Sequence, residues 1–297
     1  MTTAPTTTAR RTTGRRMSAR RRRRLGSLAL TTLTYLILVI MLAPIVYLLV
    51  ASTQPASTLA SGRYTLNASF SAFSDMWRTV EFGKYLRNSL IVCTAAAMLA
   101  TLLAAGAGYA LARLPFRGRG VLSISVIGTQ LVPGTMFLLP LFLGFIWLGR
   151  SAKIDLLDSH AGLALVYAAF FMPVSVYLMR AFFQAIPVEL EEAALVDGCS
   201  PRGAFWRVVL PNATPGLLAT FTYAFLFAWD ELLFAAALTR GSSETIPIGI
   251  RNFIGNYSEE YDQLMAAGVV STIPVMVAFF LTQRWLVQGL TAGAVKG

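Results

Sequence analysis

The sequence has few charged residues for its length. Charged residues make up 13% of the 297, whereas a soluble domain has about a quarter, and hydrophobic residues make up 56%. The mean hydropathy is +0.62. A water-soluble fold cannot remove this much apolar surface from water, whereas a lipid bilayer can cover it. The composition therefore excludes a pair of soluble domains and predicts a single membrane bundle.

Residues suited to metal or nucleophilic chemistry are also scarce. The chain has two cysteines and one histidine. Cys93 falls in an apolar run and Cys199 in a polar loop, so they form neither a disulfide framework nor a zinc pattern. His160 has no ligand partner nearby in sequence and is interpreted as a plain loop histidine. No G-x-x-x-x-G-K-[ST] phosphate loop occurs, so we predict no metal, no cofactor and no catalytic residue in this chain.

Acidic residues are absent from the N-terminal tail, where nine of the first 24 residues are arginine. A nucleic-acid-binding arm is one interpretation. A cytoplasmic anchor that orients the first span is favoured, because the tail lacks interleaved aromatics for base stacking. An organelle transit peptide stays open. The apolar run at 25–51 is longer than the roughly 7–15 residues of a signal-peptide core, so we expect a retained helix.

Six stretches are apolar and long enough to cross a bilayer, which takes about 20 residues. Their approximate limits are 26–50, 88–112, 121–148, 160–180, 213–238 and 264–287. They do not alternate apolar and polar residues, so helices are expected rather than barrel strands. We predict an all-α membrane protein of six transmembrane helices. Its parts are a disordered basic tail over 1–25, a six-helix transmembrane domain over 26–287 and a C-terminal tail over 288–297.

Loop charges predict the topology. The 112–120 loop carries three arginines and no acid, so we place it in the cytoplasm with the basic tail. The loops at 51–87, 149–159 and 239–263 mix acids and bases and fit the outside. An even number of spans then returns the C-terminus to the cytoplasm, so both termini of this multi-pass membrane protein are expected there. The 239–263 loop either caps the bundle or reaches a partner or substrate outside.

The segment over 181–212, between the fourth and fifth spans, predicts two short helices joined by a turn. Pro187 suits a first helical turn, and Gly198 suits a left-handed C-terminal cap. Ser200 can cap the second helix, with Pro201 in its first position. Such a helix-turn-helix in the cytoplasm offers a compact shape for a partner's groove.

This segment carries a recognisable motif. Glu192-Ala193-Ala194 is followed by three residues, Gly198, nine residues and then Val-Val-Leu-Pro at 208–211. The pattern resembles the EAA loop of binding-protein-dependent ABC importers, with valine where an isoleucine is usual. Further similarity to the carbohydrate-importer branch, and to its smaller maltose-permease-like subunit, lies at 88–90, 109–113, 227–231 and 290–297. The resemblance covers nearly everything from about residue 26 onward, and it implies a location in the bacterial inner membrane.

The resemblance implies the type I importer permease fold, with the helix-turn-helix as the ATPase-coupling loop. The residues that it assigns to coupling are Glu192, Ala193, Ala194, Asp197, Gly198, Phe205, Leu210 and Pro211. It implies that ATP and magnesium bind a separate dimer of ATPase chains, so this chain is no enzyme. Its other implied partners are a homologous second permease and an extracytoplasmic solute-binding protein.

The cargo implied by the resemblance is a sugar or oligosaccharide. The same importer type could carry a sugar phosphate, a polyol or a peptide instead. The candidate pathway residues in the fifth span are Tyr223, Phe227, Trp229, Asp230 and Glu231. Intramembrane acids are costly and often functional, but Asp230 and Glu231 could also lie near the watery end of their helix. An ion-coupled transporter is disfavoured because the spans have almost no central charges, and an intramembrane enzyme is disfavoured because no paired catalytic residues occur.

Overall fold

The computed structural model describes residues 14–62, 64–65, 68–255 and 260–294, and all regular structure in these ranges is helical. The all-α prediction is therefore confirmed. The chain divides into two units, Met1–Ala51 and Ser52–Gly297.

The first unit contains one long helix, α1 (Gly14–Ala51). Its Leu30–Ala51 part has a mean hydropathy of 2.7, which suits a membrane span. The helix begins earlier than expected, so residues 14–25 are helical where a disordered tail was predicted. Arginine is a good helix former, and an existing helix extends more easily than a new one starts. Residues 1–13 of that predicted tail lie outside the described residues.

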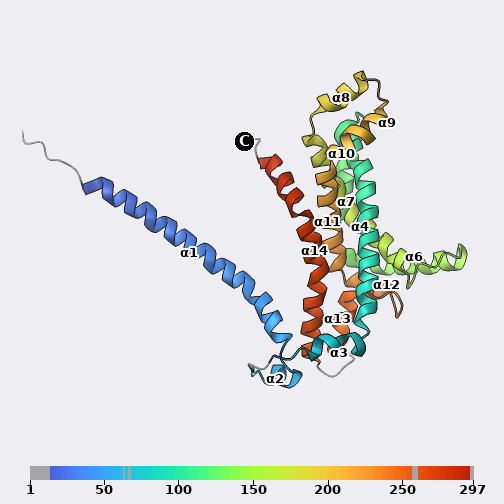
Figure 1. The fold of residues 1–297 in the computed structure, drawn as a ribbon. Helices are drawn as coiled ribbons and strands as arrows, with labels where there is room; N and C mark the ends of the chain where they lie inside the picture. The colour runs from blue at the N-terminus through green and yellow to red at the C-terminus, as the bar shows by residue number, and fades with distance from the viewer. Residues whose placement is uncertain (1–13, 63, 66–67, 256–259, 295–297) are drawn as a thin grey trace, which may run out of the picture. The chain divides into compact units, whose positions relative to one another are not determined.

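The second unit is a helical bundle with short helices at both ends (Figure 1). Its helices before the coupling segment are α2 (Ala56–Ser61), α3 (Ser71–Thr79), α4 (Phe82–Arg113), α5 (Arg119–Gly128), η1 (Thr129–Leu131), η2 (Gly134–Phe137), α6 (Leu138–Ser151) and α7 (His160–Ala185). The coupling segment holds α8 (Val188–Val196), α9 (Pro201–Ala204), η3 (Phe205–Val209) and α10 (Leu210–Asn212). The remaining helices are α11 (Thr214–Trp229), α12 (Leu233–Leu238), α13 (Ile246–Gly255) and α14 (Tyr261–Ala294).

The centre of the bundle is formed by α4, α7, α11 and α14, with α4 against both α7 and α11. The face of α4 toward these helices consists of small residues, including Ala97, Ala100 and Ala104, which are all fully buried. A β-carbon on Gly108 would lie only 2.8 Å from the Met179 Cβ atom, so the two backbones approach closely there. Small residues at membrane helix interfaces permit such close approach.

Two of the predicted spans are interrupted. The 121–148 stretch breaks into α5, η1, η2 and α6, because Pro133 lacks an N–H and holds Val132 in an extended conformation (φ −87°, ψ 122°). The 213–238 stretch breaks after Trp229, where α11 ends, and resumes at α12. Five helical segments of the described chain meet the length and hydropathy of a span, and α11, with 16 residues, is not among them. The count of six spans stays a prediction.

The loops gather at two opposite ends of the second unit (Figure 1). At one end lie α8 and α9, and the side chain of Arg113 reaches the Ile186 carbonyl there. At the other end lie α3 and α13. The Asp158 carboxylate accepts from the backbone N–H of Arg240, which ties the 149–159 loop to the segment that leads into α13. The segments around α3 and α13, which are predicted to be outside, thus lie opposite the α8 end, which is predicted to be cytoplasmic.

Candidate functional site

The predicted coupling segment, about residues 181–212, contains two short helices, α8 and α9, joined by a tight turn. Gly198 has φ +87°, the left-handed conformation that only glycine adopts freely. The Cys199 N–H donates to the Ala194 carbonyl at 2.9 Å, which closes the end of α8. The Ser200 hydroxyl accepts from the Gly203 N–H and caps α9, with Pro201 in its first turn. The turn chemistry predicted from the sequence is present at each of these residues.

The outer surface of α8 combines acidic and apolar side chains. Glu192 and Ala193 are exposed, whereas Ala194 is buried against the rest of the segment. Val196 is 88% exposed, and Trp206 of η3 is 65% exposed. Exposed large apolar side chains and acids on one short segment are typical of a surface that binds a partner protein.

The predicted coupling residues divide into an outer and an inner set. The outer, exposed set is Glu192, Ala193, Asp197, Gly198 and Pro211, and the inner, buried or half-buried set is Ala194, Phe205 and Leu210. Phe205 turns inward, and its ring centroid lies 4.6 Å from that of Tyr109 on α4. The sequence did not predict this division.

A π-helical turn, η3, precedes Pro211. Proline in a helix has no N–H to donate to the carbonyl four residues earlier, and its ring crowds that carbonyl. A wider turn relieves this crowding, and such turns occur frequently at functional sites. The Val-Val-Leu-Pro end of the motif is thus a local widening of the helix that leads into α11.

Glu191, which directly precedes the motif, is the acid of α8 that points inward. Its carboxylate accepts a hydrogen bond from the Tyr109 hydroxyl. The Nε atom of Arg113 lies 3.8 Å from Glu191 Oε2, and the two side chains are only 10% and 16% exposed. Sequence reasoning missed this role, although 109–113 had been noted as a segment of family similarity.

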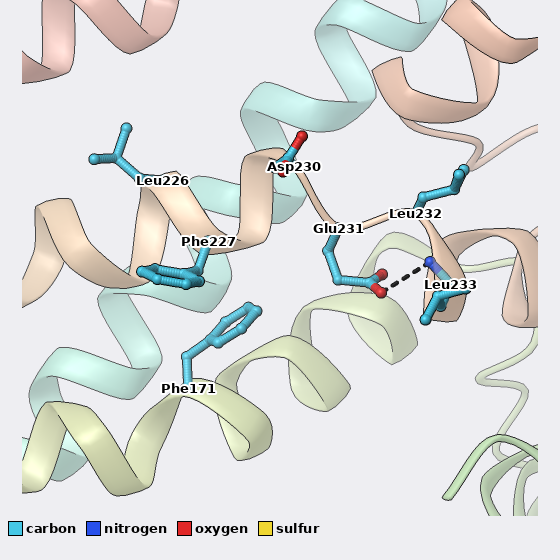
Figure 2. Close-up of a pocket in the computed structure, with 7 residues that line it drawn as sticks. All are labelled: Phe171, Leu226, Phe227, Asp230, Glu231, Leu232 and Leu233. Atoms are coloured by element: carbon cyan, nitrogen blue, oxygen red, sulfur yellow. Dashed lines mark hydrogen bonds between the residues drawn. The ribbon is translucent and has the colours of Figure 1, made fainter. Parts of the chain in front are cut away.

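A second candidate site is a depression of about 580 Å³ beside the break between α11 and α12 (Figure 2). Its lining residues are Phe171, Leu226, Phe227, Asp230, Glu231, Leu232 and Leu233. The rings of Phe171 and Phe227 lie next to each other in this lining, tilted by 47° with centroids 6.1 Å apart. Aromatic rings beside polar groups are what a saccharide site requires, since sugar rings stack on aromatic faces and their hydroxyls bond polar atoms.

The two acidic residues of this pocket, Asp230 and Glu231, lie in different environments. The Glu231 carboxylate accepts from the backbone N–H groups of Leu233, Phe234 and Ala235, so it caps α12. Figure 2 shows this carboxylate turned toward Leu233, and Asp230 directed away from the rings. Among the described residues, Asp230 makes no hydrogen bond or ion pair and its side chain is exposed.

The other predicted pathway residues lie outside the pocket lining. Trp229 is buried, and its indole N–H donates to the Ser271 carbonyl on α14 at 3.2 Å. Tyr223 is half-buried, and its ring lies 4.6 Å from that of Phe227 between centroids. The structure therefore places Phe227, Asp230 and Glu231 together, Tyr223 beside them and Trp229 elsewhere.

A polar network near the N-terminal end of α4 holds the 239–255 segment in place. Asn88 donates from Nδ2 to the carbonyls of Ser242 and Glu244, each at 2.9 Å. Its Oδ1 atom lies 2.8 Å from His160 Nε2. Because both Asn88 donors are used, His160 must donate in this bond. The described chain has no cluster of three or more His, Cys, Asp or Glu side chains that could hold a metal ion, and His160 forms part of this network.

The chain resembles known transport proteins along most of its length. Residues 100–292 match the family described as binding-protein-dependent transport system inner membrane component. The trehalose transport system permease protein SugB of Mycobacterium tuberculosis is 35% identical over 260 residues, covering 86% of this chain and 93% of that one. The trehalose/maltose transport system permease protein MalG of Thermococcus litoralis is 32% identical, covering 88% and 94%.

The fold also matches a solved structure. One chain of a crystal structure of a bacterial ABC transporter involved in the import of the acidic polysaccharide alginate has a TM-score of 0.72. The two chains are 23% identical, and the match covers 88% of this chain and 96% of the other. At this identity the similarity establishes the fold.

Proposed function

The chain belongs to the family of binding-protein-dependent transport system inner membrane components, and on this premise we propose that it is the permease half of an ATP-driven sugar importer. It would pair with a second, homologous permease and form half of the translocation pathway. A solute-binding protein outside the membrane would deliver the cargo. Two ATPase chains, which bind ATP and magnesium, would drive it from the cytoplasm.

One observation carries the coupling role. The Glu192-Ala193-Ala194 motif lies on a short helix at the end of the bundle, with Glu192 exposed and Ala194 buried. A helix with one face buried against its own chain and the other face exposed can insert into a groove of a partner protein. The exposed acid would face basic groups of the ATPase, and the apolar Val196 and Trp206 would fill the groove beside it.

The relatives support a carbohydrate as cargo. Trehalose, maltose and diacetylchitobiose are named for the relatives SugB, MalG and DasC, the last from Streptomyces coelicolor and 31% identical. The pocket beside Phe227 has an aromatic face and the free acid Asp230, which suits one ring of a saccharide. Tyr223 would extend this pathway along α11. Glu231 would serve it indirectly by holding α12 in place.

The structure also supports the proposed orientation. Arg113, Arg117 and Arg119 belong to the loop at the α8 end, and Arg202 and Arg207 lie on the coupling segment itself. Basic residues concentrate on the cytoplasmic side of membrane proteins. We therefore place the α8 end in the cytoplasm and the 149–159 and 239–263 loops outside, and we propose from the arginine-rich tail and the predicted even span count that both termini are cytoplasmic.

Co-purification from mildly solubilised native membranes tests this function. We expect the tagged wild-type chain to bring down an ATPase and a second permease. Glu192→Arg should lose the ATPase and keep the second permease, because a cation would face the basic groove. Glu189→Arg is the matched control, since Glu189 is an exposed acid of the same helix outside the motif. Recovery of no ATPase with the wild-type chain, where other importers stay intact, would refute the proposal.

A further inference from the structure

Helix α4 is bonded at one end to the coupling helix and at the other end to the segment that faces outside. At its C-terminal end, Tyr109 and Arg113 bind Glu191 of α8. At its N-terminal end, Tyr85 and Asn88 bind the 242–252 segment. We propose that α4 is the element that couples the ATPase surface to the binding-protein surface, with Tyr109 and Tyr85 as its positioning residues. This inference rests on the proposed function above.

The contact at the coupling end joins four helices, α4, α7, α8 and η3. The Tyr109 ring packs against Phe183 of α7, with centroids 5.6 Å apart, and against Phe205 of η3, at 4.6 Å. Its hydroxyl donates to Glu191. A displacement of α8 must therefore either move α4 with it or break a bond to a half-buried carboxylate. Breaking such a bond is costly because the acid loses its partner away from water.

Arg113 strengthens this contact from the next turn of α4. One of its terminal nitrogens donates to the Ile186 carbonyl, where α7 ends before α8 begins. Its Nε atom faces Glu191 at 3.8 Å, which is an ion pair but too long for a hydrogen bond. The coupling helix is thus fixed to α4 through its own acid and through the residue that leads into it.

The contact at the opposite end has the same character. The Tyr85 hydroxyl donates to Glu244 Oε2 at 3.3 Å and accepts from Asn252 Nδ2 at 3.1 Å. The Ser89 hydroxyl accepts from the Ile246 N–H at 2.8 Å, and Ser89 is fully buried. These bonds hold the start and middle of α13 on the end of α4. A binding protein that presses on this segment would therefore press on α4.

The helix between the two contacts is suited to transmit displacement. It has 32 residues without proline, a length of about 48 Å at 1.5 Å per residue. A continuous helix is stiff along its axis, whereas both partner segments are short helices joined by turns. Coupling between distant sites requires an element that both sites bias, and α4 is bonded to both.

The test uses two matched substitutions that each remove one hydroxyl from α4 and keep the ring. Tyr109→Phe acts at the coupling end and Tyr85→Phe at the opposite end. The control is Tyr177→Phe, which removes the hydroxyl bond from α7 to Ser123 of α5. Each variant is purified as the full importer complex in lipid nanodiscs. ATP hydrolysis is measured with and without the sugar-loaded binding protein.

We expect the binding protein to stimulate hydrolysis in the wild-type complex and in Tyr177→Phe to the same degree within about twofold. Tyr109→Phe and Tyr85→Phe should each lower the stimulation about tenfold, since a hydrogen bond to a charged group is worth at least that factor. The double variant should be little worse than either single one, because two breaks in one chain of contacts are not additive. The ATPase subunits should remain bound in all four variants.

Full stimulation in Tyr109→Phe, or an equal loss in Tyr177→Phe, would overturn the inference and leave the proposed function standing. Loss of the ATPase subunits from Tyr109→Phe would also overturn it, because the residue would then serve assembly rather than transmission. A wild-type complex that captures no ATPase, or whose hydrolysis the loaded binding protein does not stimulate, would overturn the proposed function itself.

Discussion

Asp158 and Ser243 lie 85 residues apart in the sequence, yet the Ser243 hydroxyl donates to Asp158 Oδ1 at 2.6 Å. The same oxygen accepts from the backbone N–H of Arg240 at 2.9 Å, and Oδ2 accepts from the Ser242 hydroxyl at 3.0 Å. Asp158 itself has φ +47°, a left-handed conformation that aspartate tolerates better than most residues. One carboxylate therefore ties the 152–159 loop to the start of the 239–255 segment.

The hydrogen bonds of this carboxylate predict that the stability of the fold depends on pH. Burial acts to raise the pKa of Asp158, but hydrogen bonds from Ser243 and neighbouring groups outweigh it and hold the pKa below its ordinary value. The unfolded chain, with a carboxyl pKa near 3.9, binds the proton more readily. The stabilisation is therefore full above about pH 4 and is lost as the pH falls through the lower, folded-state pKa.

The corresponding substitution is Asp158→Asn. At pH 6 we expect it to lower the free energy of unfolding by about 1 kcal/mol, a value reduced by the partial exposure of the site. The difference from wild type should shrink as the pH falls below 4. Asp155→Asn, at an exposed acid of the same loop, should change little at either pH. Thermal unfolding in detergent measures this, and a difference that grows toward low pH would contradict the assignment.

Glu231 should matter for stability more than for sugar contact. Its carboxylate accepts from three backbone N–H groups at the start of α12. Glu231→Ala should therefore lower the free energy of unfolding by roughly 1–2 kcal/mol, the cost of a lost cap. Asp230→Ala, at the adjacent acid without a partner, should leave the melting temperature near that of wild type. Equal melting temperatures for the two variants would show that Glu231 does not cap α12 in solution.

Phe227 should contribute to sugar affinity. Its side chain is 55% exposed and lies beside Phe171 in the pocket lining. Phe227→Ala should raise the KM for sugar uptake about 3- to 10-fold, because an aromatic contact is worth roughly 0.5–1.5 kcal/mol. Phe279→Ala is the control, since Phe279 is a similarly exposed aromatic on α14 outside the pocket. An unchanged KM in Phe227→Ala would remove this pocket from the pathway.

Gly108 should be intolerant of any side chain. A β-carbon there would lie 2.8 Å from the Met179 Cβ atom and 2.9 Å from the Arg180 backbone nitrogen. Gly108→Ala should thus force α4 and α7 apart and destabilise the fold by about 1–3 kcal/mol. Gly106→Ala, two residues away and with open space around it, should be neutral or mildly stabilising. Thermal unfolding separates the two, and equal stability would refute the close approach of these helices.

The sequence predicted the features that depend on local chemistry. Gly198, Ser200 and Pro201 carry turn and cap preferences that act within a few residues, so the helix-turn-helix could be placed in advance. The break after Trp229 could not, because no proline or glycine marks it. At this break the Glu231 carboxylate accepts from the first N–H groups of α12. The local sequence pattern does not reveal this contact.

The inward role of Glu191 also depends on tertiary structure. Glu189, Glu191 and Glu192 look equivalent in the sequence, and the motif directs attention to Glu192. Which acid turns inward depends on the position of α8 relative to the end of α4. The partners Tyr109 and Arg113 are about 80 residues earlier in the chain, so only the fold brings them to Glu191.

The most direct test of the account is uptake of radiolabelled trehalose, maltose or diacetylchitobiose into proteoliposomes that contain the purified importer complex. We predict accumulation of at least one of these sugars only when ATP and magnesium are present on the ATPase side and the binding protein is present on the other. An ion gradient alone should support none. Accumulation driven by a proton or sodium gradient without ATP would contradict the account and make the chain a secondary transporter.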